Sequence, residues 1–325
     1  MRVLVVGGAG YIGSVTVDQL LQSGHTVTVL DSLVSGHREA VNADAELVVA
    51  DVRAEDGLAR LMASHSFEAV VYYGGFIQAG ESVINPGRYF ANNVAGCIAL
   101  LNAMVAYGVG HFVFSSSAAV YGEPDEVPIS EDSPLRPVNP YGEAKLMVER
   151  MLPWYEKQGI RYISLRYFNA AGASDRRGED HRPETHLIPI VLQVAAGQRD
   201  AVPLYGTDYP TPDGTCIRDY VHVADLAAAH ILALESASGG DSGVYNLGNG
   251  TGFSNREVIE AAGRVTGKPI AVREEPRRPG DPARLVAASD RVKRVLGWMP
   301  AFTDLEAIVE SAWRWHQAHP KGYST

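Results

Sequence analysis

Cysteine and positive charge are both scarce in this chain. Its 325 residues include two cysteines, Cys97 and Cys216. Two cysteines cannot build a disulfide framework and their spacing does not match a zinc site, so we expect a reducing, cytoplasmic location and no metal centre. Lys and Arg number 28 against 38 Asp and Glu, for a formal net charge of −10. Nucleic-acid binding usually needs a basic surface, so we expect no nucleic-acid partner, and an anionic ligand must be held by a few local cations.

Long apolar runs and targeting signals are also missing. No apolar run approaches the roughly 18 residues of a membrane span, so we expect no membrane partner. Residues 2–6 read as a strand next to Met1. This leaves no room for a signal peptide, and we expect the mature protein to begin at Met1. A chain of this length favours one large α/β unit with a smaller appendage.

Apolar, β-branched runs alternate with helical patterns through the first half of the chain. The expected strands are residues 2–6, 25–31, 46–50, 67–73, 111–115 and 161–167, and the expected helices are 12–23, 88–107 and 140–157. This alternation predicts a doubly wound parallel sheet of the Rossmann type. Beyond about residue 170 Gly, Pro, Asp and Arg become frequent, which indicates long functional loops. We therefore predict a dinucleotide-binding domain over 1–175 and a smaller C-terminal α/β substrate domain over 176–325.

The first predicted strand runs into a glycine-rich turn. Gly7, Gly10 and Gly13 form the pattern GxxGxxG between this strand and the start of a helix. Glycines here permit a tight turn and let a pyrophosphate approach the backbone N–H groups of the helix N-terminus. Asp31 ends the second strand 18 residues after Gly13, near the usual spacing of about 20 for the acid that binds the adenosine ribose. Its carboxylate would repel a 2′-phosphate, so the pattern predicts NAD rather than NADP.

Tyr141 and Lys145 form a candidate reaction pair. A spacing of four residues puts both side chains on one face of the helix that Pro140 begins. Such a pair is common on helix surfaces, but here the strand at 111–117 ends in three serines, at the edge where open α/β sheets bind ligands. One positive charge about 6 Å away, at an effective dielectric of about 20, is worth roughly 3 kcal/mol, or about two pKa units. Lys145 and an oxidised nicotinamide would together lower the pKa of Tyr141 toward neutrality and make it a general base for a substrate hydroxyl.

Seven motifs, in order along the chain, carry a resemblance to a known family. They are the GxxGxxG turn and the segments 115–122, 139–145, 165–169, 209–223, 245–250 and 277–281. These motifs are similar to those of the UDP-galactose 4-epimerase family, within the extended short-chain dehydrogenases/reductases. The resemblance spans essentially the whole chain, and 209–223 is its most characteristic piece. It implies a cytoplasmic isomerase of galactose metabolism that interconverts UDP-galactose and UDP-glucose by transient oxidation at sugar C4, with NAD tightly bound.

The resemblance also implies three sets of site residues. The catalytic set is Ser117, Tyr141 and Lys145. The residues implied around NAD are Gly7, Gly10, Tyr11, Ile12, Gly13, Asp31, Ser32, Asp51, Val52, Asn92, Tyr141, Lys145, Tyr167 and Phe168. The residues implied around the UDP-sugar are Ser117, Tyr141, Asn169, His186, Leu187, Tyr205, Arg218, Arg278, Asp281 and Leu285. The two arginines would meet the diphosphate through charge-assisted hydrogen bonds.

Three positions depart from the family pattern. Ile77 stands where many family members carry a lysine, and His186 stands where an asparagine often touches the substrate. Leu285 replaces a residue, commonly Tyr or Cys, that lines the sugar end of the pocket. These departures leave the reaction residues intact, but they leave open which sugar is bound.

Several alternatives remain open. A 4-epimerase acting on a UDP-N-acetylhexosamine or a UDP-pentose fits the same motifs. A sugar-nucleotide 4,6-dehydratase is disfavoured, because that family has an Asp-Glu pair after the catalytic strand, where this chain has Ala118 and Ala119. A non-catalytic sensor that binds NAD is a further possibility, since fold does not determine function. By analogy with the family, the helices at 88–107 and 140–157 would pair in a homodimer.

Overall fold

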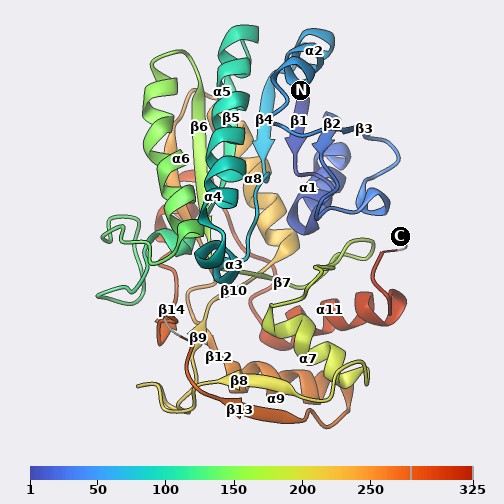
Figure 1. Cartoon of the computed structure of the whole chain (residues 1–325), viewed down its shortest axis with the longest axis vertical. Coiled ribbons are helices and arrows are strands. Elements are labelled where there is room, and N and C mark those ends of the chain that lie inside the picture. The colour runs from blue at the N-terminus through green and yellow to red at the C-terminus, as the bar shows by residue number, and fades with distance from the viewer. Residues whose placement is uncertain (279, 324–325) are drawn as a thin grey trace.

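A parallel sheet forms the centre of the larger part of the molecule. The structure, a computed structural model, describes residues 1–278 and 280–323. The strands of the sheet are β1 (Arg2–Val6), β2 (Thr26–Asp31), β3 (Glu46–Val49), β4 (Ala69–Tyr72), β5 (His111–Ser117), β6 (Arg161–Tyr167) and β11 (Gly243–Leu247). Their order is β11-β6-β5-β4-β1-β2-β3, and every neighbouring pair is parallel (Figure 1). The predicted doubly wound fold is confirmed, and β11 is a seventh strand that the apolar runs did not predict.

Helices cover both faces of this sheet. They are α1 (Tyr11–Gln22), α2 (Glu55–His65), α5 (Gly96–Tyr107), α6 (Pro140–Glu156), α8 (Val223–Ser238) and α10 (Asp290–Leu296). Val3 and Val5 of β1 belong to the buried cluster that includes α1, α8 and α10, whereas Leu4 and Val6 belong to the cluster that includes α2, α5 and α6. Successive strand residues point to opposite faces, so a continuous apolar strand supplies a core on each side.

The helix at 86–107 is continuous but not regular. It consists of α4 (Pro86–Tyr89), a π-helical segment η2 (Phe90–Ala95) and α5. By length and composition alone this helix is long and apolar enough to cross a membrane, with a mean hydropathy of 1.4 over its most apolar window, but Arg88 and three asparagines interrupt it. The expectation that the chain has no membrane partner stays a prediction. Its inner side packs in the core through Cys97, Leu100, Leu101 and Met104.

A smaller unit lies at the carboxyl edge of the sheet (Figure 1). Its helices are α7 (Leu187–Ala195), α9 (Asn255–Thr266) and α11 (Leu305–Ala318), which share a buried cluster. Short strands complete it: β8 (Val202–Tyr205) with β13 (Val272–Glu275), and β9 (Ile217–Arg218) between β12 (Phe253–Ser254) and β14 (Arg284–Leu285). A parallel pair of β7 (Asn169–Ala171) and β10 (Tyr220–His222) joins the two units. Because α8, β11 and α10 return to the large unit, the chain crosses between the units more than once, and the boundary at residue 175 stays a prediction.

Candidate active site

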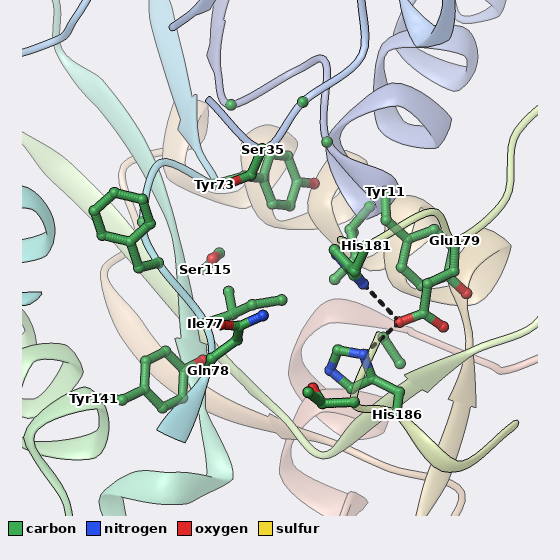
Figure 2. A pocket seen from close by; sticks show the side chains of 18 of the residues that line it. Tyr11, Ser35, Tyr73, Ile77, Gln78, Ser115, Tyr141, Glu179, His181 and His186 are labelled. Atoms are coloured by element: carbon green, nitrogen blue, oxygen red, sulfur yellow. Dashed lines mark hydrogen bonds and ion pairs between the residues drawn. The ribbon is translucent and has the colours of Figure 1, made fainter. Parts of the chain in front are cut away.

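A cavity of about 1320 Å³ lies where the large unit meets the small one (Figure 2). Its walls include residues at or just after the ends of β1, β2, β3, β4, β5 and β6, all at the carboxyl edge of the sheet. The segment 179–190 and parts of β8 and β9 close the other side. Parallel sheets of this type bind their ligands at that edge, so the fold places the cavity at the expected ligand site.

The glycine turn has the shape of a phosphate cradle. Gly7 has a φ of +79°, in the left-handed region that favours glycine, and a Cβ at Gly13 would overlap the Gly7 carbonyl oxygen. Gly10 lines the cavity and precedes α1, and no side chain of the described residues caps that helix end. The backbone at the start of α1 is therefore open to the cavity, as a bound pyrophosphate requires.

Asp31 is oriented by the loops around it. Its Oδ2 accepts the Ala9 N–H at 3.0 Å and its Oδ1 accepts the Leu33 N–H at 2.9 Å. Burial raises the pKa of Asp31, and these two hydrogen bonds act against that rise. The carboxylate lines the cavity next to Ser32, where it can accept the ribose hydroxyls of a dinucleotide.

The three serines at the end of β5 point in two directions. Ser115 and Ser117 line the cavity, and Ser116 points to the opposite face of the sheet, where its hydroxyl donates to Glu149 at 2.5 Å. Glu149 also pairs with Arg166 at 2.5 Å, and both side chains are only 5% exposed. Strand alternation thus assigns two serines to the cavity and one to a buried ion pair beneath it.

Tyr141 and Lys145 face the same cavity from the first turns of α6. The helix begins at Pro140, and Asn139 caps it by accepting the Gly142 N–H at 2.9 Å. The Lys145 Nζ lies 5.9 Å from the centre of the Tyr141 ring and donates to the Ser115 carbonyl oxygen at 2.6 Å. Burial lowers the pKa of Lys145 to about 8. Burial raises the pKa of Tyr141 above its ordinary value, and the neighbouring Ser117 hydroxyl offsets part of that rise.

Two arginines face the cavity from the smaller unit. Arg218 in β9 forms an ion pair with Asp281, and its side chain is 10% exposed. Arg278 lies over the Tyr205 ring, with its guanidinium carbon 3.8 Å from the ring centre. A stacked guanidinium keeps its N–H groups at its edge, so Arg278 can still bind an anion.

Most of the site residues implied by the sequence lie on this one cavity. The residues on its wall are Gly7, Gly10, Tyr11, Ile12, Gly13, Asp31, Ser32, Asp51, Val52, Asn92, Ser117, Tyr141, Lys145, Tyr167, Phe168, Asn169, His186, Leu187, Tyr205, Arg218, Arg278 and Asp281. Leu285 is the exception: it is not on the wall, and it packs, partly buried, against a cluster that includes Phe168. Ile77 is on the wall and 40% exposed, so this position is open to a ligand.

Sequence reasoning missed a cluster on the far side of the cavity from Tyr141 (Figure 2). Glu179, His181, Glu184 and His186 bring their donor atoms within 4.8 Å of one another. Burial opposes a charge on His186, but Glu179 and Glu184 outweigh it and raise the pKa of this imidazole to about 10. In the same cluster, burial alone would raise the pKa of Glu179. The neighbouring His186 and His181 outweigh the effect of burial and lower the pKa of Glu179 to about 2. The sequence contains a signal that could have predicted this cluster, because two His and two Glu fall within eight residues.

The glycine turn, Asp31 and the gathered Ser117, Tyr141 and Lys145 are typical of a short-chain dehydrogenase/reductase of the extended type. The model of the NAD dependent epimerase/dehydratase family matches residues 3–248. The chain is 52% identical over 329 residues to the UDP-glucose 4-epimerase of Halalkalibacterium halodurans, covering 100% of this chain and 98% of that relative.

Two solved structures are similar over their full lengths. A crystal structure of a UDP-glucose 4-epimerase has a TM-score of 0.98 at 47% identity and covers 100% of both chains. The UDP-glucose 4-epimerase of Bifidobacterium longum in complex with NAD+ and UDP has a TM-score of 0.94 at 36% identity, covering 99% of this chain and 100% of that one. This chain belongs to the NAD-dependent epimerase/dehydratase family, and NAD is its cofactor.

Proposed function

We propose that this chain interconverts UDP-galactose and UDP-glucose, with NAD retained in the cavity between turnovers. The observation that carries the proposal is that one cavity holds the glycine turn, the Tyr141 and Lys145 pair, and Arg218 and Arg278. The glycine turn suits a dinucleotide, and the arginines suit a second diphosphate. Relatives that are about half identical over the whole length are UDP-glucose 4-epimerases.

The residues of the chain divide the work of the reaction. When bound, NAD takes the hydride from sugar C4 and returns it to the other face of the same carbon. Tyr141 takes the proton of the sugar 4-hydroxyl and later gives it back, and Ser117 orients that hydroxyl. Arg218 and Arg278 hold the diphosphate while the sugar turns over. Asp31 holds the adenosine ribose.

The electrostatics of Tyr141 link the proton step to cofactor binding. Burial keeps the pKa of Tyr141 above its ordinary value in the protein without ligands. The Lys145 ammonium, 5.9 Å from the ring, favours the phenolate, and the positive charge of oxidised NAD favours it further. The oxidised cofactor should therefore make Tyr141 more readily ionised than it is in the protein without ligands.

One alternative substrate class has support in the structure. Leu285 is smaller than tyrosine and packs against the buried cluster that includes Phe168, which lines the cavity. A smaller side chain here leaves Phe168 free to shift and admit a bulkier group on the sugar. We therefore expect detectable activity on UDP-N-acetylgalactosamine beside the activity on UDP-galactose, with a modest preference between them.

We further propose that the chain is a cytoplasmic homodimer. Large apolar side chains are exposed along the adjacent α3 (Ala79–Ile84), α5 and α6: Ile84 is 78% exposed, Tyr107 44%, Met147 38% and Trp154 65%. Apolar surface of this extent is typical of an interface between chains. Sedimentation velocity tests it: we expect a dimer, and a monomer at micromolar concentration would contradict the proposal.

The assay that tests the function uses protein desalted after purification. With UDP-galactose and no added NAD we expect UDP-glucose to accumulate to a constant ratio of the two sugars. Acid-denatured protein should release NAD. A sensor without catalytic activity would bind NAD and leave UDP-galactose unchanged, and a requirement for added NAD would contradict the retained cofactor.

A further inference from the structure

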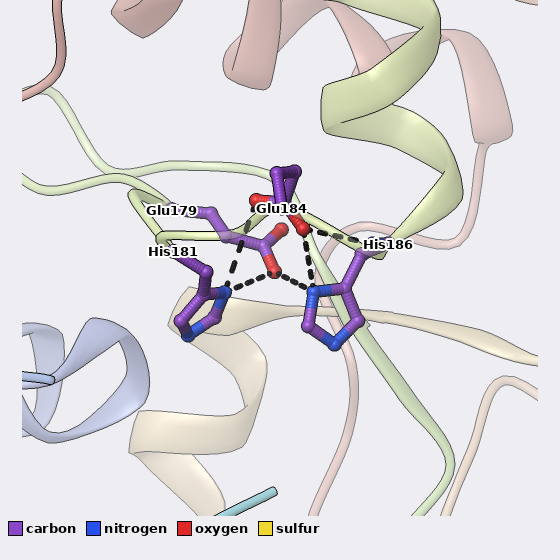
Figure 3. A group of neighbouring side chains, drawn as sticks. All are labelled: Glu179, His181, Glu184 and His186. Atoms are coloured by element: carbon purple, nitrogen blue, oxygen red, sulfur yellow. Dashed lines mark hydrogen bonds and ion pairs between the residues drawn. The ribbon is translucent and has the colours of Figure 1, made fainter. Parts of the chain in front are cut away.

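Four side chains of one short segment converge in front of α7. Glu179, His181, Glu184 and His186 direct their donor atoms at a common point (Figure 3). The Nδ1 atoms of His181 and His186 lie 3.1 Å and 2.9 Å from the same Glu179 oxygen. The Glu184 carboxylate closes the group: its Oε1 lies 2.8 Å from the His186 Nδ1, and its Oε2 lies 3.9 Å from the His181 Nδ1.

These spacings fit the edges of a metal coordination shell. A zinc ion binds imidazole nitrogen and carboxylate oxygen at about 2.0 to 2.2 Å, which puts neighbouring ligands of a tetrahedron about 3.3 to 3.6 Å apart. The separations of 3.1 Å and 2.9 Å from the Glu179 oxygen and of 3.9 Å from the Glu184 Oε2 bracket that range, so shifts of about half an ångström would centre an ion among the four side chains. Imidazole and carboxylate together suit zinc and its first-row neighbours better than magnesium or calcium.

The charges of the cluster also suit a divalent cation. The side chains of Glu179 and Glu184 are 9% and 5% exposed. Two buried carboxylates side by side are costly unless each is paired, and in the described part of the chain their ion pairs are with the two imidazoles alone. One proton on each imidazole balances the two negative carboxylates, and one divalent ion in place of these two protons would supply the same positive charge.

The surroundings orient the ligands as a metal site requires. The backbone N–H groups of Thr185 and His186 donate to one Glu184 oxygen at 2.7 Å and 2.8 Å, which leaves the second oxygen for an ion. The ring of His181 meets the ring of Tyr11 edge-on, with 6.3 Å between their centres. The cluster therefore bridges the glycine turn and the first turn of α7.

We propose that Glu179, His181, Glu184 and His186 bind one divalent transition-metal ion of the zinc type, in the wall of the cavity opposite Tyr141. The ion would neutralise two carboxylates beside a cavity that must accept anionic ligands, and it would hold the segment 179–186 against α7. It does not reach the reacting atoms, and the proposal holds whatever sugar the chain converts.

Metal binding by the NAD-containing protein tests the proposal directly. The protein is treated with a chelator, desalted and titrated with Zn²⁺ by calorimetry, and in parallel with Co²⁺ by visible absorption. We expect one equivalent per chain, an intense Co²⁺ spectrum of low coordination number, and a melting temperature a few degrees higher with the ion bound. Glu184→Gln, which keeps an acceptor for the backbone N–H groups, and His181→Asn should each weaken Zn²⁺ binding at least about tenfold.

His65→Asn is the matched control. His65 pairs with Glu46 at 2.7 Å as an isolated surface His and Glu, without the converging second pair. Its loss should leave the stoichiometry and affinity for Zn²⁺ unchanged. Binding well below one equivalent in the wild type, or equal affinities for Glu184→Gln and His65→Asn, would overturn the proposal. Circular dichroism and the NAD content show whether Glu184→Gln folds. If it does not fold, the Zn²⁺ affinity of His181→Asn and the Zn²⁺ stoichiometry of the wild type still test the proposal.

Discussion

Replacing Lys145 by methionine isolates the charge that the proposed mechanism needs. Methionine is similar in length and apolar, so the buried site keeps most of its packing while the ammonium is lost. The Lys145 Nζ lies 5.9 Å from the Tyr141 ring centre. At an effective dielectric of about 20, one charge at this distance is worth about 3 kcal/mol, or about two pKa units on Tyr141.

The sign of this effect determines the pH profile. The lysine charge stabilises the phenolate, so removing it raises the pKa of Tyr141 and moves the acid limb of kcat upward by about two pH units. Near neutral pH the variant should therefore be about 100-fold slower than the wild type and should recover as the pH rises. The rate of UDP-galactose conversion from about pH 6 to about pH 10 measures this directly.

Lys157→Met is the control for that profile. Lys157 lies just beyond the same helix, over the Trp154 ring on the surface, with 4.2 Å between its Nζ and the ring centre. Its loss should leave the acid limb where it is. If Lys145→Met lowers the rate equally at every pH, Lys145 acts by positioning alone and the electrostatic reasoning fails.

Three further outcomes are expected. Glu149→Gln leaves the buried Arg166 charge uncompensated and should lower the free energy of unfolding by about 3 to 5 kcal/mol in urea denaturation; a loss below about 1 kcal/mol would contradict a tightly coupled pair. Burial lowers the pKa of His222 and His230 to about 4. Each therefore contributes stability that is present above about pH 6.5 and is lost, by about 3 kcal/mol, as the pH falls toward 4. The free energy of unfolding of His230→Gln should fall less steeply with decreasing pH than that of the wild type, and equal slopes would refute this. Leu285→Tyr should suppress turnover of UDP-N-acetylgalactosamine much more than that of UDP-galactose, and an equal effect on both would show that Leu285 does not control sugar choice.

Local patterns predicted the elements that local chemistry determines. The strand at 2–6, the glycine turn and the helix begun by Pro140 all lie where the sequence indicated, because apolar periodicity, glycine conformation and capping act within a few residues. Asp31 was also predictable, since its distance along the chain from the turn reflects one strand and one helix.

Long-range pairing decided the features that were missed. The strand β11 is short, and only its pairing with β6 places it in the main sheet. Leu285 was aligned to the sugar end of the pocket; it packs against the buried cluster that includes Phe168 and is not among the residues that line the cavity, and its role in sugar choice stays a prediction. The Glu179 cluster required the fold of the loop before α7, which no periodic pattern describes.

The central claim is that Tyr141 and the bound cofactor oxidise and re-reduce the sugar at C4. Incubating the desalted protein with UDP-galactose deuterated at C4 tests it, with the product analysed by mass spectrometry and proton NMR. We predict UDP-glucose that keeps its deuterium at C4, formed without added NAD, and a rate at least about 100-fold lower in Tyr141→Phe. Exchange of the C4 deuterium with solvent, or near-normal turnover by Tyr141→Phe, would contradict the account.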